Sequence, residues 1–125
     1  MRFMMLVKHA ENLSGPPPKG FMDEMAKLHE QAVKEGTIRD SGGLSPLSKS
    51  TRVRLSKGQL TAIDGPYSEA KEVVGGFAVF ELNSRQEAID GATRFMELHK
   101  KHWPGWEGET EVRQILGPED MVPKA

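Results

Sequence analysis

The sequence contains no cysteine, which excludes disulfide bonds, thiolate catalysis and cysteine-ligated zinc or iron–sulfur sites. It also lacks any run of about 18 apolar residues, the minimum for a membrane-spanning helix. Residues 1–8 are too short an apolar stretch for a signal peptide and have no cleavage site, so we expect none. These absences predict a cytoplasmic protein without a membrane partner.

Neither sign of charge dominates the chain. There are 17 Lys and Arg residues against 18 Asp and Glu residues, a formal net charge of −1. A neutral chain has no electrostatic reason to seek nucleic acid, so we expect no nucleic-acid partner. Gly-rich phosphate loops, nucleophile elbows and zinc-protease helices are also missing.

The length of 125 residues suits one domain, which we expect to cover 1–125 with a flexible C-terminal tail over 117–125. Glycine and proline number 13 and 8, enough for many turns but too few for disorder. Alternation and helical spacing of apolar residues predict the regular elements. Strands are expected over 2–8, 37–44, 51–56, 59–63, 75–82 and 109–116, and helices over 21–35 and 84–101.

Both helices have boundary signals and an apolar stripe. The first ends at Gly36, and its stripe comprises Phe21, Met22, Met25, Leu28, Ala32 and Val33. The second begins with a capping box of Ser84 and Glu87, and its stripe comprises Ala88, Ile89, Ala92, Phe95, Met96 and His99.

The element order predicts an α+β fold. Without a hairpin at 51–63, whose tip is Lys57-Gly58, the order is β–α–β–β–α–β, the split βαβ of ferredoxin-like domains. Two helices cover one face of such a sheet, yet the strands at 2–8 and 77–82 are apolar on both faces. We therefore expect a homodimer through the uncovered sheet faces. The alternative is that this face lines a ligand pocket in a monomer.

The most distinctive run is Asp-Gly-Pro-Tyr at residues 64–67, followed by Gly75-Gly76-Phe77. It resembles the Asp-Gly-Pro-Phe signature of the YCII-related proteins, with Tyr67 in the Phe position. Residues 1–7, 42–44 and 102–108 also look like that family, so the resemblance spans most of the chain. It implies a ferredoxin-like dimeric α/β barrel with an inserted hairpin. Some members accompany sigma-factor-like regulators, and others look like small enzymes related in fold to muconolactone isomerases and cofactor-free monooxygenases.

The signature run has two interpretations. Asp64 could be a general acid or base, or anchor a ligand, with the Tyr67 hydroxyl as a donor. Alternatively, the run is a rigid turn in which Asp64 only accepts backbone hydrogen bonds. Lys71 and Glu72 could bracket a polar ligand, or they could be an exposed pair of little energetic value.

His29 is a second catalytic candidate, on the first predicted helix. The YciI-like branch implies a helix histidine paired with an aspartate. Counting back from Gly42, that position falls near Met25 or Ala26, about one turn before His29. The alternative is an ordinary surface or half-buried histidine.

Two further groups are candidate ligand contacts. Arg54 lies in a basic strip with Lys49, Arg52 and Lys57 that could attract a carboxylate or phosphate, or could be a solvated edge. Trp103, with Trp106, could stack on a planar ligand or a partner subunit, or could plug the end of the barrel.

We expect no metal and no cofactor. His99 and His102 share one side of a helix, but no third ligand stands at a suitable spacing. Haem or metal binding through these histidines is the remaining alternative.

The residues support two functions. One is a dimeric small-molecule-binding protein or small enzyme, with its site in a cleft near the 64–67 turn. The other is a non-catalytic regulatory module that acts with a sigma-factor-like partner. The sequence does not decide whether the chain is an enzyme.

Overall fold

A computed structural model describes residues 1–10 and 15–121 of the chain. Its strands are β1 (Arg2–Ala10), β2 (Ile38–Gly43), β3 (Thr51–Ser56), β4 (Gln59–Asp64), β5 (Glu72–Glu81) and β6 (Gly108–Ile115). Its helices are α1 (Lys19–Glu35), the 3-10 turn η1 (Leu47–Lys49), α2 (Arg85–His102) and α3 (Pro118–Met121). The fold is α+β, as expected.

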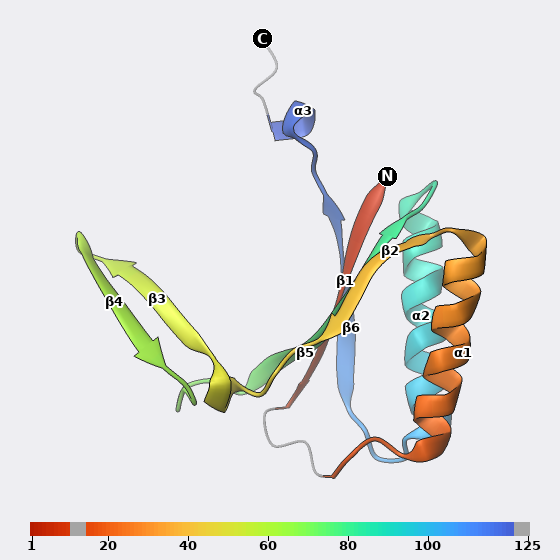
Figure 1. The fold of residues 1–125 in the computed structure, drawn as a ribbon, viewed down its shortest axis with the longest axis horizontal. Helices are drawn as coiled ribbons and strands as arrows, with labels where there is room; N and C mark the ends of the chain where they lie inside the picture. Colours follow the sequence, from red (N-terminus) through yellow and green to blue (C-terminus); the bar gives the residue numbers. More distant parts are fainter. Residues whose placement is uncertain (11–14, 122–125) are drawn as a thin grey trace.

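Four strands form one antiparallel sheet in the order β2-β5-β1-β6 (Figure 1). This order is compatible with a ferredoxin-like arrangement. In the register, Met5 of β1 lies between Ala78 of β5 and Val112 of β6. Odd-numbered residues of β1 therefore share one face with even-numbered residues of β5 and β6.

The core lies between this face and α2. Phe3 and Met5 are buried against Ala88 and Ala92, and Phe80, Leu82 and Val112 pack around them. Phe3 is 1% exposed, and Ala88 and Ala92 belong to the apolar stripe predicted for this helix. Both long helices lie on this side of the sheet (Figure 1).

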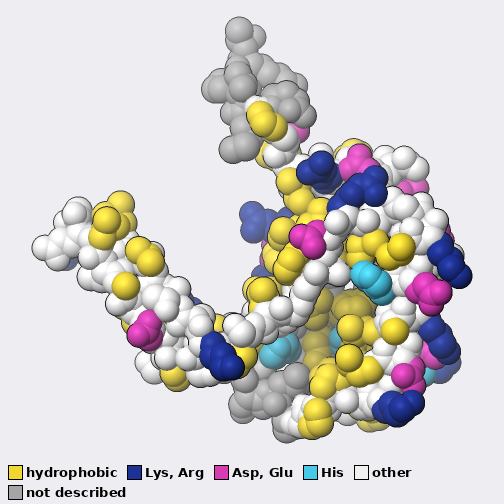
Figure 2. Space-filling view, in the orientation of Figure 1, with side chains coloured by type: hydrophobic (Ala, Val, Ile, Leu, Met, Phe, Trp, Pro, Cys, Tyr) yellow, Lys and Arg dark blue, Asp and Glu magenta, His cyan; other side chains and the backbone are white. Residues whose placement is uncertain are grey.

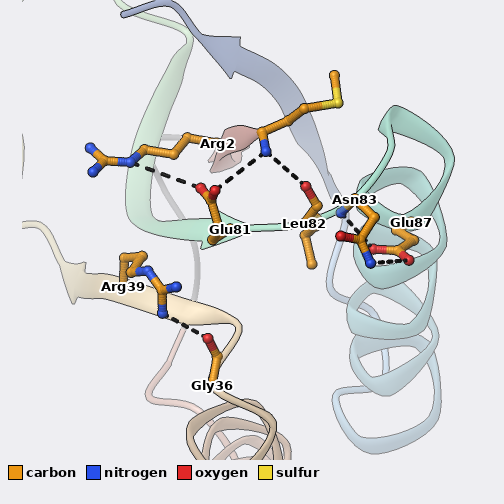
Figure 3. Close-up of polar contacts among 8 residues, drawn as sticks. Arg2, Gly36, Arg39, Glu81, Leu82, Asn83 and Glu87 are labelled. Carbon is orange, nitrogen blue, oxygen red and sulfur yellow. Dashed lines mark hydrogen bonds and ion pairs between the residues drawn. The ribbon is translucent and has the colours of Figure 1, made fainter.

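Polar contacts fix the end of the sheet where β5 meets α2 (Figure 3). The backbone N–H of Glu87 donates to Ser84 Oγ at 3.1 Å, the contact that a capping box requires. The Glu87 carboxylate accepts from the backbone N–H of Asn83 at 3.0 Å, one residue before the expected partner. Just before β1, the N-terminal ammonium of Met1 donates to Leu82 O at 3.0 Å.

No helix within the described residues covers the other face of the sheet (Figure 1). Its middle is apolar, with Met4 and Leu6 of β1 opposite Val79 and Phe77 of β5. Around them, Lys8 Nζ donates to Glu111 Oε1 at 2.6 Å. We call this surface the open face.

Strands β3 and β4 pair only with each other and form a separate two-stranded arm. Its tip is the predicted Lys57-Gly58 turn, in which both residues have positive φ, 51° and 77°. The arm and the helices lie on opposite sides of the sheet (Figure 1). One face of the arm is apolar, and Val53, Leu55 and Leu60 are 75%, 69% and 73% exposed.

Several boundaries differ from the sequence prediction. β5 begins at Glu72 rather than residue 75, because β1 continues past a register shift at Val7/Lys8 and pairs Ala10 with Glu72. Within the expected tail, α3 covers Pro118–Met121, and residues 122–125 lie outside the described residues; the flexibility of the tail stays a prediction. In the predicted stripe of α1, Met22 and Val33 are 47% and 55% exposed, so they lie on the solvent side of the helix and not on its packed side.

Among the described residues, no helix is long and apolar enough to cross a membrane.

Candidate functional site

A groove of about 1000 Å³ runs between the two long helices and the sheet. Figure 2 shows it as a hollow in which hydrophobic and histidine side chains gather. The side chains that define its chemistry are Met5, Val7, His9, Phe21, Met25, Leu28, His29, Ala32, Phe80, His99, Trp103 and Trp106.

Glycines explain why this space is open. Gly43 of β2 lies opposite Gly76 of β5, and both line the groove with Gly75. A glycine in a strand has no side chain to fill the space between the sheet and a helix above it. The stripe of α1 therefore faces a hollow where a helix would otherwise pack on the sheet.

An aromatic cluster closes one end of the groove around His99. The His99 ring lies 4.5 Å from the ring of Phe21, 4.7 Å from Phe95 and 4.3 Å from Trp106, measured between centroids. Trp103 lies 5.1 Å from Phe21. Three segments thus contribute to one wall: the start of α1, the end of α2 and the turn before β6.

The His99 side chain is 4% exposed. Its Nδ1 lies 2.8 Å from the carbonyl oxygen of Phe95. Because a carbonyl oxygen only accepts, Nδ1 bears the proton and Nε2 is an acceptor. Burial lowers the pKa of His99 below its usual value, and the hydrogen bond to Phe95 opposes that shift.

A second histidine lies further along the groove. His9 lies on the same face of β1 as Met5 and Val7. Its Nδ1 donates to Ala10 O at 2.7 Å. Its ring occupies the space where a side chain on Gly75 would be. Charged side chains at the rim are Glu35, Glu87, Asp90 and Arg94.

The structure divides the predicted site residues into two groups. His29 and Trp103 line the groove, His29 as an exposed side chain and Trp103 as a half-buried one. Asp64, Tyr67, Lys71 and Arg54 do not line it. They lie along the arm and in the segment that joins the arm to β5.

The signature turn, residues 64–67, is held by contacts at the base of the arm. Thr51 Oγ1 donates to Asp64 Oδ1 at 2.8 Å, and the N–H of Gly65 donates to Ser50 O at 2.9 Å. Tyr67 is buried, and its hydroxyl lies 2.8 Å from Ser50 Oγ. These contacts hold the turn in place, but Asp64 accepts from the side chain of Thr51 and not from the backbone N–H groups expected of such a turn. A catalytic role for Asp64 stays a prediction.

Arg52 contacts both the buried ring of Tyr67 and the exposed carboxylate of Glu69. Its guanidinium lies 3.6 Å from the centre of the Tyr67 ring, and Nη1 donates to Glu69 Oε1 at 3.0 Å. A backbone hydrogen bond and then the charges of Arg52 and Arg54 lower the pKa of Glu69. Arg54 and Lys71 are exposed.

A smaller cavity of about 410 Å³ lies beside the signature turn. Leu47, Ser50, Arg52 and Glu72 are among its lining residues. Asp64 and Tyr67 are not, although the Tyr67 hydroxyl lies 2.8 Å from Ser50 Oγ. The signature therefore supports the wall of this cavity and leaves its surface to other side chains.

No three His, Asp or Glu side chains gather into a possible metal site within residues 1–10 and 15–121. His99 and His102 differ in environment, since His99 is buried in the aromatic cluster and His102 is half-buried outside the groove lining.

A model of the YCII-related domain matches residues 1–99. The chain belongs to the YCII-related family. The matched part includes the signature turn, both long helices almost entirely, and the whole of the groove's floor on β1, β2 and β5.

One relative is an uncharacterized protein of Rhizobium meliloti, 30% identical over 71 residues. That match covers 57% of this chain and 57% of the relative's length. Trp103, Trp106 and β6 lie beyond the residues that the YCII-related model matches. The aromatic end of the groove thus combines the YCII-related domain with the segment that follows it.

Two of the groove's polar residues are not expected there from the sequence. His9 has no role in the sequence prediction, and His99 is expected as a buried stripe residue or, in the alternative, as a haem or metal ligand. The position of His9 can be predicted from the alternation of a strand, which places it on the same face as Met5 and Val7. The signal for His99 was its place in the apolar stripe of α2.

Proposed function

We propose that the protein binds a small, largely apolar organic molecule in the groove between the helices and the sheet, and that it does so as a homodimer. The single observation that supports this function is the groove itself. Its volume of about 1000 Å³ is at the upper end of the range for small-molecule sites. Mostly apolar walls with a few polar groups are also typical of such sites.

The walls favour a planar, aromatic ligand. Phe21, Trp103 and Trp106 offer ring faces and edges at one end. Aromatic pairs contribute about 0.5–1.5 kcal/mol beyond the area that they bury. Met5 and Met25 add flexible side chains that adapt to ligand shape.

The proposal is tested by filling the groove. Ala32 lines the groove, whereas Ala26, on the same helix, is exposed and does not. We expect Ala32→Phe to weaken binding of α-methoxynaphthalene at least tenfold in isothermal titration calorimetry, and Ala26→Phe to leave it unchanged. Equal affinities for the two variants, or no binding by the unmodified protein, would contradict the proposal.

The open face supports a second copy of the chain as the partner. Met4, Leu6, Phe77 and Val79 form an apolar patch that no helix covers. A face of a sheet that is apolar and lacks a covering layer is typically buried against another protein surface. Beside this patch, Lys8 and Glu111 form an ion pair, and polar groups of this kind are found at the rim of an interface.

The arm supports the same arrangement. An isolated two-stranded ribbon is marginally stable in water, and this one exposes Val53, Leu55 and Leu60. It projects from the side of the sheet that lacks helices, next to where a second copy would dock (Figure 1). We propose that the partner subunit packs against both the open face and the arm.

A further inference from the structure

We propose that His99 is a specificity-determining residue of the groove, and that its Nε2 accepts a hydrogen bond from the hydroxyl group of an aromatic ligand. The ligand class is then a phenol or an enol. This inference rests on the proposed function, since it names the chemistry of the molecule that the groove would bind.

The first argument is the tautomer. The 2.8 Å contact between Nδ1 and Phe95 O places the imidazole proton on Nδ1. The other nitrogen, Nε2, consequently presents a lone pair. It has no hydrogen-bond partner among the described residues.

The second argument is access. In the described part of the chain, Thr110 Oγ1 is the only fully buried side-chain polar atom without a partner. Nε2 of His99 also has no partner there, yet it is not one of the fully buried atoms, so part of its surface is accessible. The surface to which His99 contributes is the wall of the groove. Because His99 is 4% exposed and lines the groove, an accessible Nε2 without a partner would face the ligand space.

The third argument concerns charge. The rings of Phe21, Phe95 and Trp106 surround His99 and provide no water-like solvation for an imidazolium. A neutral imidazole with a lone pair facing the groove repels a carboxylate oxygen and attracts a hydroxyl proton. His99 therefore selects for a hydrogen-bond donor at this end of the groove.

The test compares α-naphthol with its methyl ether, α-methoxynaphthalene, by isothermal titration calorimetry. One additional hydrogen bond predicts roughly threefold to tenfold tighter binding of the naphthol. In His99→Phe, which keeps an aromatic ring in the cluster, we expect the ratio of the two affinities to fall to about one. His102→Phe is the control, because His102 does not line the groove, and it should keep the preference.

A further ligand keeps the inference testable if His99→Phe does not fold. We expect α-naphthoate, whose carboxylate can only accept, to bind the unmodified protein more weakly than α-naphthol does. Equal affinity for naphthol and ether, tighter binding of naphthoate, or a preference that survives in folded His99→Phe overturns the role of His99. Absence of binding by all three compounds overturns the proposed function itself.

Discussion

The hydroxyl of Tyr67 donates to Ser50 Oγ across the base of the arm, with 2.8 Å between the oxygens. The direction follows from Ser50, whose own hydroxyl proton is donated to Leu47 O at 2.9 Å. The signature turn and η1 are therefore joined by a short chain of hydrogen bonds. This chain fixes the point at which the arm leaves the sheet.

Loss of that hydrogen bond should weaken the base of the arm. We expect Tyr67→Phe to lower the free energy of unfolding by about 0.5–1.5 kcal/mol, because the ring stays buried and only one hydrogen bond is lost. The measurement is urea denaturation. Ser50→Ala and the double variant complete a double-mutant cycle. Additive effects in the cycle would show that the two hydroxyls do not interact.

Gly65 is expected to tolerate no side chain. A Cβ at this position would overlap the carbonyl group of Leu47, which belongs to the backbone and cannot move aside easily. We expect Gly65→Ala to destabilise the protein by about 1–3 kcal/mol, the range for overpacking. Gly20→Ala is the control, because nothing lies near its Cβ position. Equal thermal midpoints for the two variants would contradict the close contact with Leu47.

The buried His99 should make stability depend on pH. Its pKa is lower in the folded protein than in the unfolded chain, so the unfolded chain binds more protons on acidification. Its stabilising contribution is complete above the usual pKa of about 6.5. That contribution is lost as the pH falls from there through the folded value, at no more than about 1.4 kcal/mol per pH unit for one proton.

The measurement for His99 is urea denaturation of the unmodified protein and His99→Phe over the acidic range. The stability of the unmodified protein should decline more steeply, because the other histidines titrate in both proteins. Parallel curves would mean that burial leaves the charge state of His99 unaffected.

The dimer should depend on the open face. We expect the unmodified protein to sediment at twice 13.9 kDa, and Leu6→Lys to sediment as a monomer because a charge enters the apolar patch. Met22→Lys, at an exposed site on α1, is the control that should remain dimeric. A monomeric unmodified protein at micromolar concentration would contradict the proposed interface.

Local patterns were sufficient for much of the fold. Apolar spacing predicted the strand at 2–8 and both long helices, and the Lys57-Gly58 turn followed from its residue types. These features depend on neighbours in the sequence. The Asp64 and His29 candidates share no surface in one subunit, because the arm and the helices lie on opposite sides of the sheet.

The groove could not be predicted in the same way. It exists because glycines of β2 and β5 are brought into register across 33 residues of chain, as Gly43 pairs with Gly76. The cluster around His99 likewise joins Phe21 to Trp106. Such contacts depend on the packed structure, which no local pattern specifies.

The most direct test of this account is long-range nitrogen–proton NMR of histidine-labelled protein, titrated with α-naphthol. We predict that His99, assigned with His99→Phe, is a neutral imidazole protonated on Nδ1, and that its Nε2 resonance shifts as the ligand is added while that of His102 does not. A proton on Nε2, or an Nε2 resonance unchanged at saturating ligand, would contradict the account.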